Sequence, residues 1–521
     1  MFPLRRMRKE VILKNPAYCL MFPLVLAGCS SGGNSVVPPE TTAALSVDTT
    51  KVAATVDERY LSVAVDMAQV VGGRFWSASG GQEIIGQEEV PEYNFTRPRL
   101  RALASHLSPA FLRIGGSDSD RVLYDLSDNP TDVAPEGFEF VLTASQVDGV
   151  FDFAQALGYD VMFTLNAGPG VRDKASAWTS NMARELVGYV VDHQYEVTLW
   201  ELGNEWNVYG PILGLQLEVP QIVADFQAAS ALLEELDPNA LFGGPSSAYW
   251  PTLGELFDGV YPGFMQMGGA DAIDVITWHY YPQQSERCPF APYRYEPERI
   301  LNAEGLDRGL GWAQEVEAVR DENAPRMPIW LGETGHAQCG GQPGASDRFE
   351  GTFWWLDQLG ALARRGHQVS VRQTLSGSDY GLIDDETLEP RPDYWASVLW
   401  RRLMGQRVLD VSRTDVDDSV RLYAHCSYQR AGAVTLLAIN LDPDKGVRLE
   451  VEGLDGAKEL YLLTATSIDS AELMLNGTVL KDDEGALPEL SPNPIGSRPV
   501  DLPARSMAFV VFPNADAFAC R

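Results

Sequence analysis

Eight short β-rich runs alternate with amphipathic helical stretches between residues 59 and 375. We predict strands at 59–66, 110–116, 160–167, 198–205, 240–247, 275–281, 327–334 and 369–375. We predict helices at 98–107, 143–158, 182–194, 219–236, 250–260, 309–322, 348–365 and 394–405. Thr143 and Asp347 stand where helix N-caps are expected. Eight βα units, with no GxGxxG turn after the first strand, favour a (β/α)8 TIM barrel over an open doubly wound sheet.

The pattern changes at about residue 406, where runs of alternating apolar and polar residues are separated by turn-rich gaps. We therefore predict a C-terminal antiparallel β-sandwich domain at 406–521, after a barrel at 57–405. The segment 45–56 also has an extended pattern, and we expect it to add a strand to the β-domain. The predicted fold class is thus α/β, a TIM barrel followed by a β-sandwich.

The N-terminus has the pattern of a targeting segment. Basic side chains precede an apolar stretch at 18–26, and the following LAGC ends at Cys29 and resembles a bacterial lipobox. We predict a signal peptide at 1–28, an acylated Cys29 and a flexible tether at 29–44. The alternative is an ordinary cleaved signal with an incidental cysteine. Because Ser30 rather than an acidic residue follows Cys29, we expect an exported, lipid-anchored protein of the bacterial outer membrane or cell surface, with no other membrane contact.

Charge and cysteine content narrow the function classes further. The net charge is −32, and removing residues 1–28, which carry five basic side chains and one acidic, makes it −36. Such a chain is a poor partner for nucleic acid. Four cysteines remain beyond the leader, and in an exported chain they suggest two disulfides. Metal ligation is the alternative, but no CxxC or HxxxH spacing supports it, and we expect no metal or cofactor.

Polar residues stand at seven of the eight predicted strand ends. A TIM barrel builds its active site from the carboxyl ends of its strands, where the βα loops converge. These residues therefore predict one rim rather than scattered surface positions. In chain order they are Asp66, Ser117, Asn166, Asn204 with Glu205, His279 with Tyr281, Glu333, and Gln373.

Two of these residues, Glu205 in WELGNE and Glu333 in WLGET, have the pattern that glycoside hydrolysis requires. That reaction uses two carboxyl groups on either side of one bond, about 5 Å apart for retention and about 6.5–9.5 Å apart for inversion. We predict that Glu205 is the acid/base and Glu333 the nucleophile. An ionised Glu333 should raise the pKa of Glu205 and keep it protonated.

Neighbouring residues receive supporting roles. Tyr281 is placed to hydrogen-bond Glu333, and Asn204 to hold a sugar 2-hydroxyl group. His279 is either a structural histidine or a direct sugar contact, and His336 receives no role. Trp354 and Trp355 lie on a predicted helix, and we expect them in the hydrophobic core and not in the active site. Two other functions stay open, a related β-glycosidase acting on a neutral sugar and a non-catalytic glycan-binding lipoprotein.

Several blocks of sequence, in order, resemble the heparanase and β-glucuronidase family, glycoside hydrolase family 79 of clan A. The resemblance runs from about residue 57 to Cys520. The densest blocks are YLSVAVD (60–66), LSPAFLRIGGSDSD (107–120), WELGNEWN (200–207), TWHYY (277–281), WLGET (330–334), VRQTLSGSDYGLID (371–384), RPDYWASVLWRRLMG (391–405) and LYAHCS (422–427).

The resemblance implies retaining hydrolysis of β-linked glucuronic acid in an oligo- or polysaccharide. Glu205 and Glu333 fall on the family's acid/base and nucleophile. The residues that fall on contacts to sugar hydroxyl groups are Asp66, Ser117, Asn204 and Gln373. Those that fall on the group receiving the uronate carboxylate are Tyr380 and the backbone at Cys339 and Gly340.

The resemblance also pairs the cysteines. Cys426 and Cys520 match the family's disulfide that ties the β-domain to the C-terminus. Cys288 and Cys339 follow the sixth and seventh strands, and we predict that they form an additional disulfide bordering the active site.

Two departures from the family bear on the substrate. The stretches GGPSSAYW (243–250) and EGFEFVLT (136–143) lack the basic residues that hold sulfated sugars. We therefore expect weakly sulfated or plant-type glucuronides rather than highly sulfated heparin. The segment 124–137 is short, so we expect no internal cleavage to open the cleft.

Overall fold

The computed structural model describes residues 41–76, 86–174, 176–255, 259–414 and 418–521. The predicted signal peptide, the predicted lipidation site Cys29 and most of the predicted tether lie outside these residues. Among the described residues, no helix combines the length and the apolar character that crossing a bilayer requires.

Eight parallel strands form a closed barrel. Each pairs with the next, and the last pairs with the first, which closes the ring. The strands are β3 (Leu61–Asp66), β6 (Ala110–Gly115), β9 (Tyr159–Leu165), β10 (Val197–Leu202), β11 (Leu241–Trp250), β13 (Val275–Tyr280), β14 (Ile329–Thr334) and β15 (Val369–Arg372). All residues of β3, β6, β13 and β14 are buried, as expected for parallel strands covered on both sides. The predicted TIM barrel is confirmed.

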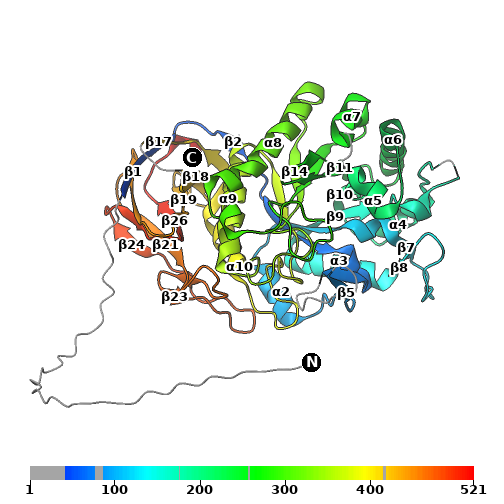
Figure 1. The fold of residues 1–521 in the computed structure, drawn as a ribbon, viewed down its shortest axis with the longest axis horizontal. Coiled ribbons are helices and arrows are strands. Elements are labelled where there is room, and N and C mark those ends of the chain that lie inside the picture. The colour runs from blue at the N-terminus through cyan, green and yellow to red at the C-terminus, as the bar shows by residue number, and fades with distance from the viewer. Residues whose placement is uncertain (1–40, 77–85, 175, 256–258, 415–417) are drawn as a thin grey trace, which may run out of the picture. The chain divides into compact units, whose positions relative to one another are not determined.

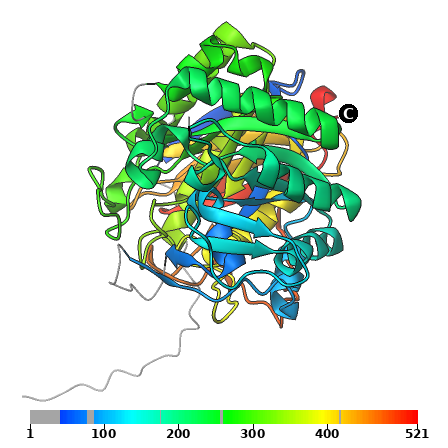
Figure 2. The ribbon, with the colours of Figure 1, turned by 90° about the vertical axis from the view of Figure 1, so that its right-hand side faces the viewer.

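Helices lie around the outside of these strands (Figures 1 and 2). The larger ones are α2 (Pro98–Ser105), α3 (Ala144–Leu157), α4 (Asn181–Asp192), α6 (Val219–Leu236), α7 (Val260–Gln266), α8 (Ala303–Asn323), α9 (Phe349–Arg364) and α10 (Pro392–Leu403). Thr143 caps α3 in a capping box, in which its backbone N–H donates to Gln146 Oε1 at 2.9 Å. Short elements occupy the connections, namely α1 (Met67–Val71), β4 (Arg74–Trp76), β5 (Gln87–Glu89), β7 (Val122–Asp125), β8 (Phe140–Thr143) and α5 (Tyr209–Leu213).

The predicted helix at 250–260 is wrong. The chain stays extended through Trp250, and β12 (Gly254–Glu255) then pairs antiparallel with β11. The side chain of Asn207 holds this extension, because it donates to the Ala248 carbonyl and accepts from the Ala248 N–H, both at 2.9 Å. A smaller correction concerns α9, whose N-cap is Arg348 rather than Asp347.

The β-domain consists of two sheets. The smaller has the order β17 (Val411–Thr414), β1 (Thr41–Val47), β20 (Val447–Glu452) and β25 (Val500–Leu502). The larger has the order β2 (Ala54–Thr55), β16 (Met404–Leu409), β18 (Val420–Ser427), β19 (Val434–Asn440), β26 (Ser506–Phe512), β21 (Lys458–Thr464), β22 (Met474–Leu475) and β23 (Thr478–Val479), with β24 (Asn493–Gly496) beside β21. Leu45 and Leu449 of the smaller sheet share one buried core with Leu436 and Val510 of the larger.

The start of this domain differs from the sequence prediction in three respects. β1 begins at Thr41, inside the predicted tether 29–44 and before the predicted strand 45–56, because burial already alternates from Ala43 onward. β1 pairs in parallel with β20, so the sandwich is not wholly antiparallel. Finally, α10 ends at Leu403 and β16 begins directly after it, slightly before the predicted boundary at 405.

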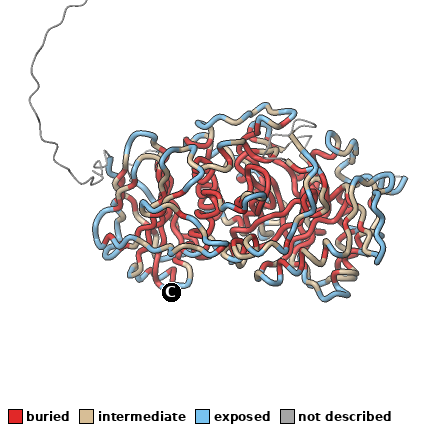
Figure 3. Tube along the Cα trace, turned by 90° about the horizontal axis from the view of Figure 1, so that it is seen from below, coloured by how far each residue is buried: buried red, intermediate tan, exposed pale blue. Residues whose placement is uncertain are grey.

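The larger sheet also packs against the barrel through α9 and α10 (Figure 1). Along β19, Leu436 and Ala438 face the sandwich core, whereas Leu437 and Ile439 join the core that contains Trp354 and Trp355 of α9. Both tryptophans are buried, as predicted. Figure 3 shows buried segments in both domains, with exposed segments at their edges.

Candidate active site

Two glutamates lie together at the carboxyl ends of the barrel strands. Glu333 belongs to β14, and Glu205 follows the end of β10. A carboxylate oxygen of each glutamate and a ring nitrogen of His279 all lie within 4.8 Å of one another. Both glutamates are more than nine-tenths buried. The fourth and seventh strands therefore bring the two predicted carboxyl groups into one small site.

A tight backbone turn after β10 positions Glu205. Gly203 has φ 64° and Glu205 has φ 58°, so both adopt the left-handed conformation. Residue 203 must be glycine, because a Cβ there would lie 2.0 Å from the hydroxyl oxygen of Tyr209. Asp120 holds this turn through two hydrogen bonds. Its Oδ2 accepts from the Tyr209 hydroxyl at 2.7 Å and from the Asn204 N–H at 2.9 Å.

Arg113 of β6 connects the groups of the site. Its guanidinium is fully buried and donates to Glu201 Oε2 at 2.7 Å, to Glu333 Oε2 at 2.9 Å and to Asn204 Oδ1 at 3.1 Å. Burial alone would lower the pKa of Arg113, but the charges of Glu201 and Glu333 raise it above its usual value. The sequence analysis assigned no role to Arg113. The available signal was one charge inside the apolar run AFLRIG, since a buried charge needs buried partners.

Both oxygens of Glu333 are held. The Tyr281 hydroxyl donates to Oε1 at 2.7 Å, which is the hydrogen bond predicted from the sequence, and Arg113 donates to Oε2. Two donors on one carboxylate restrict its rotation. Glu333 is therefore oriented as a fixed carboxylate.

Glu205 has a different environment. Burial raises its pKa to about 7, and the positive charge of Arg113 opposes this shift. The direction of this shift was predicted correctly from the sequence, with an ionised Glu333 as the expected cause. The predicted cause was wrong, since desolvation raises this pKa. A carboxyl group with a pKa near neutrality suits a proton donor that must later accept a proton.

His279 lies between Glu205 and Arg113. Its Nδ1 lies 3.1 Å from Glu205 Oε1, and its Nε2 lies 3.5 Å from Nη2 of Arg113. Because a guanidinium can only donate, Nε2 is the accepting nitrogen, and Nδ1–H donates to Glu205. Burial lowers the pKa of His279 to about 4, so the ring is neutral at pH 7. Its side chain is fully buried, which favours the structural role over a direct sugar contact.

Glu205, His279 and Glu333 are also close enough for one ion to contact all three. Arg113, however, places a permanent positive charge on the Glu333 oxygen that would be a ligand. Bringing a cation next to this guanidinium would cost Coulomb energy in a buried site. The donor set thus fits acid–base chemistry better than metal binding.

The residues expected to hold sugar hydroxyl groups surround this centre. Gln373, just after β15, donates through Nε2 to Asp66 Oδ2 at 2.9 Å. Burial, then the charges of Asp118 and Glu333, raise the pKa of Asp66 to about 8. The chain approaches Asp66 closely at Gly116, where a Cβ would lie 2.2 Å from Oδ2, and this places the half-buried Ser117 beside Asp66.

Asn204 and Asn166 both follow barrel strands, but only Asn204 contacts the residues of the site. Asn204 accepts from Arg113 through Oδ1, which leaves its Nδ2 group for a ligand. Asn166 also ends a strand, but its amide nitrogen donates to the Val122 carbonyl at 2.8 Å and its oxygen accepts from the Gly168 N–H at 2.7 Å. Asn166 therefore supports a loop instead of contributing to the site.

The backbone around Gly340, which we expected from the resemblance to receive a carboxylate, has an unusual conformation. Cys339, Gly340 and Gly341 have φ values of 64°, 84° and 87°. The Gly340 carbonyl accepts from Ser378 Oγ at 2.7 Å and from the Tyr380 N–H at 3.1 Å. Among the residues that the structure describes, the N–H groups of Cys339 and Gly340 donate to no protein acceptor. Adjacent backbone amides without a protein acceptor favour an anion.

Tyr380 lies beside this backbone, with its ring centroid 6.5 Å from that of Tyr281. The two predicted disulfides are present, Cys288–Cys339 with Cα atoms 5.5 Å apart and Cys426–Cys520 with Cα atoms 5.2 Å apart.

His336, to which the sequence assigned no role, is buried. Its Nδ1 lies 2.6 Å from Ser346 Oγ, and burial lowers its pKa to about 3. It supports the loop after β14 and contributes nothing to the site directly.

Comparison with known proteins decides the family. Residues 42–360 match the family model described as glycosyl hydrolase family 79, N-terminal domain. The chain belongs to this family. Heparanase of Gallus gallus is 31% identical, over 93% of this chain and 98% of that protein. Heparanase-like protein 1 of Arabidopsis thaliana is 31% identical, over 84% and 88%. Inactive heparanase-2 of Mus musculus is 31% identical, over 73% and 66%.

Solved structures confirm the fold of this glycosyl hydrolase. The family 51 arabinofuranosidase of Xanthomonas axonopodis pv. citri has a TM-score of 0.64 at 16% identity, covering 91% of this chain and all of that one. A 4-O-α-L-rhamnosyl-β-D-glucuronidase of Fusarium oxysporum 12S has a TM-score of 0.62 at 16% identity, covering 90% and 100%. At such identities the likeness concerns the fold alone.

Proposed function

We propose that this family 79 protein is a retaining β-glucuronidase that releases β-linked glucuronic acid from a glycan or glycoconjugate. The observation that carries the proposal is the approach of Glu205 and Glu333 to within 4.8 Å. Retaining enzymes place their carboxyl groups about 5 Å apart, whereas inverting enzymes need about 6.5–9.5 Å to admit a water molecule between them.

The two environments assign the roles. Glu333, held by Tyr281 and Arg113, attacks the anomeric carbon while Glu205 gives its proton to the leaving oxygen. The glycosyl–Glu333 bond is then broken by water, and the ionised Glu205 takes the proton of that water. A pKa of about 7 for Glu205 lets the same group act in both steps near neutral pH.

Two observations support a uronic acid as the sugar. The free amides of Cys339 and Gly340 lie next to Tyr380 and offer donors for a carboxylate. Two of the similar proteins described above are named heparanase and heparanase-like protein 1. One relative is named inactive, so the site geometry, and not family membership, supports catalysis. The net charge of −32 supports a weakly sulfated glycan over a highly sulfated one.

The test compares the purified protein on 4-nitrophenyl β-glucuronide, β-glucoside and β-xyloside. We expect the glucuronide to have the highest kcat/KM, and proton NMR of early product to show the β-anomer first. Activity on the neutral sugars alone would refute the uronate assignment. An α-anomer formed first would refute retention, and no turnover of any glycoside would favour a binding protein.

We also infer that the protein is exported and anchored by lipid at Cys29 in the bacterial cell envelope. The support is the sequence, in which a basic region, an apolar stretch and LAGC occur in order. Cells supplied with labelled palmitate should label the wild type but not Cys29→Ser. Equal labelling, or equal membrane recovery of the two proteins, would refute the anchor.

A further inference from the structure

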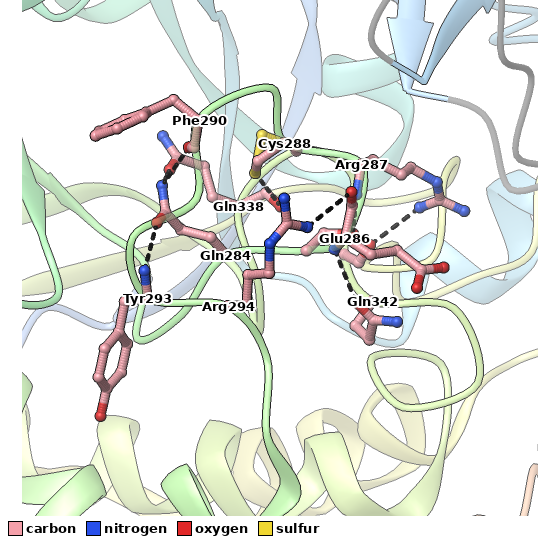
Figure 4. Close-up of a disulfide and its surroundings, with 12 residues drawn as sticks. Gln284, Glu286, Arg287, Cys288, Phe290, Tyr293, Arg294, Gln338 and Gln342 are labelled. Carbon is pink, nitrogen blue, oxygen red and sulfur yellow. Dashed lines mark hydrogen bonds between the residues drawn. A yellow bond between two sulfur atoms is a disulfide. The ribbon is translucent and has the colours of Figure 1, made fainter.

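The loops that follow β13 and β14 lie side by side around the Cys288–Cys339 disulfide (Figure 4). The Gln338 N–H donates to the Gln283 carbonyl at 2.9 Å, and the Ser285 N–H donates to the Gln338 carbonyl at 3.2 Å. The Gln284 side chain donates to Gln338 Oε1, also at 3.2 Å. The two loops are thus joined by hydrogen bonds as well as by the disulfide.

Arg287, beside Cys288, extends these contacts to the loop after β15. It donates to the Gly341 carbonyl at 3.0 Å and forms an ion pair with Asp379, the neighbour of Tyr380. Glu286 also contributes, since its N–H donates to Gln342 Oε1 at 3.0 Å. The loops after β13, β14 and β15 are therefore in contact with one another around the backbone of Cys339 and Gly340.

Cys339 is the link between these contacts and the free amides. With φ 64° it holds a left-handed conformation that a non-glycine residue keeps only when its surroundings impose it. Gly340 and Gly341 follow in the same region of backbone space and have no side chain to hold them. Without the cross-link, residue 339 loses the covalent restraint on this conformation, and a relaxation toward negative φ would rotate its N–H and that of Gly340.

The catalytic glutamates are held by other contacts. Glu333 is fixed by Tyr281 and Arg113, and Glu205 by the turn at Gly203 and by His279. None of these contacts includes a residue of the disulfide. The cross-link can therefore affect recognition of the sugar without moving the reacting groups.

We propose that the Cys288–Cys339 disulfide is a positioning element for substrate selection, which holds two backbone amides where they receive the uronate carboxylate. The reduced protein keeps its hydrolytic chemistry and loses its preference for the charged sugar. This inference rests on the proposed β-glucuronidase function.

The experiment compares Cys288→Ser/Cys339→Ser with Cys426→Ser/Cys520→Ser as the matched control. The substrates are 4-nitrophenyl β-glucuronide and its methyl ester, in which the sugar carboxyl group has lost its negative charge and gained a methyl group. The readout is the ratio of their kcat/KM values. We expect the ratio to fall about 10- to 100-fold in the first variant, mainly through KM of the glucuronide, and to stay unchanged in the control.

Mild reduction provides a second test that needs no variant. One dithiothreitol molecule supplies two electrons to the disulfide, giving two cysteine thiols and cyclic oxidised dithiothreitol. Cys339 is partly exposed, whereas Cys288, Cys426 and Cys520 are buried, so the Cys288–Cys339 pair should react first, through Cys339. Thiol counting should show two thiols together with the lowered ratio, and reoxidation should restore the ratio.

The outcomes separate the two proposals. A wild type that does not hydrolyse the glucuronide refutes the proposed function, whatever the disulfide does. If the wild type is active, an unchanged ratio on loss of Cys288–Cys339 overturns the inference. A parallel fall of both substrates also overturns it, because that result indicates general loosening of the site.

Discussion

Replacing Glu205 with Gln should impair catalysis and, above neutral pH, stabilise the fold. Burial raises the pKa of Glu205 from 4.5 to about 7. Between these two values the folded protein binds a proton that the unfolded chain does not, so the free energy of unfolding falls as pH rises. A shift of roughly 2.5 pKa units corresponds to about 3 kcal/mol once the pH exceeds the folded pKa.

Glutamine resembles the protonated carboxyl group at every pH. Its amide oxygen can still accept from Nδ1–H of His279, as Glu205 does at 3.1 Å. We therefore expect Glu205→Gln and the wild type to have equal stability at pH 4.5. At pH 8 the variant should be more stable by up to about 3 kcal/mol.

The assay is the melting temperature of both proteins by calorimetry across this pH range. A chain of this size should gain a few degrees at pH 8 and almost none at pH 4.5. A difference in melting temperature that does not depend on pH would refute the reasoning. So would a variant less stable than the wild type at pH 8, because both results mean that ionising Glu205 carries no desolvation cost.

The remaining predictions concern the groups around Glu205. Glu333→Gln should abolish turnover on all glycosides while circular dichroism shows an unchanged fold. Residual turnover would mean that another residue is the nucleophile. Above pH 7, kcat/KM for alkyl glucuronides should fall about tenfold per pH unit as Glu205 ionises, whereas nitrophenyl glucuronides, which need little protonation, should fall less; parallel profiles would contradict this. Arg113→Met should lower the free energy of unfolding, measured with denaturant, by about 3–5 kcal/mol because it leaves buried carboxylates unpaired. Arg430→Met, at a half-exposed ion pair, should lower it by less than about 1 kcal/mol. Similar losses in the two variants would contradict the role of Arg113. Tyr281→Phe should lower kcat by about 10- to 100-fold with little change in KM, and an unchanged kcat would show that its bond to Glu333 is dispensable.

The sequence predicted the barrel because its signal is local. Eight apolar runs alternate with helical stretches and seven of them end in a polar residue, so strand positions and the rim follow from short segments. The helix predicted at 250–260 was wrong because a distant side chain, Asn207, holds Ala248 extended. β1 begins before the predicted start because residues 41–44 become a strand only through pairing with β17 and β20, which lie hundreds of residues away.

The site shows the same limit. Glu205, Glu333 and Tyr281 stand at strand ends and could be predicted, whereas Arg113 lies within a strand. Its partners Glu201 and Glu333 are 88 and 220 residues away, so no local pattern reveals the pairing. The cause of the Glu205 pKa shift was missed for the same reason.

Arg113 distinguishes two glutamates whose carboxylate oxygens lie within 4.8 Å of one another. If the site held only Glu205 and Glu333, repulsion would decide which of them keeps a proton, and the two roles could exchange. Arg113 removes this ambiguity because it donates to Glu333 and makes no hydrogen bond to Glu205 among the described contacts. Burial then raises the pKa of Glu205, while the neutral His279 supplies a hydrogen bond without supplying charge. The difference between acid and nucleophile therefore follows from the burial of Glu205 and from the hydrogen bonds that orient Glu333.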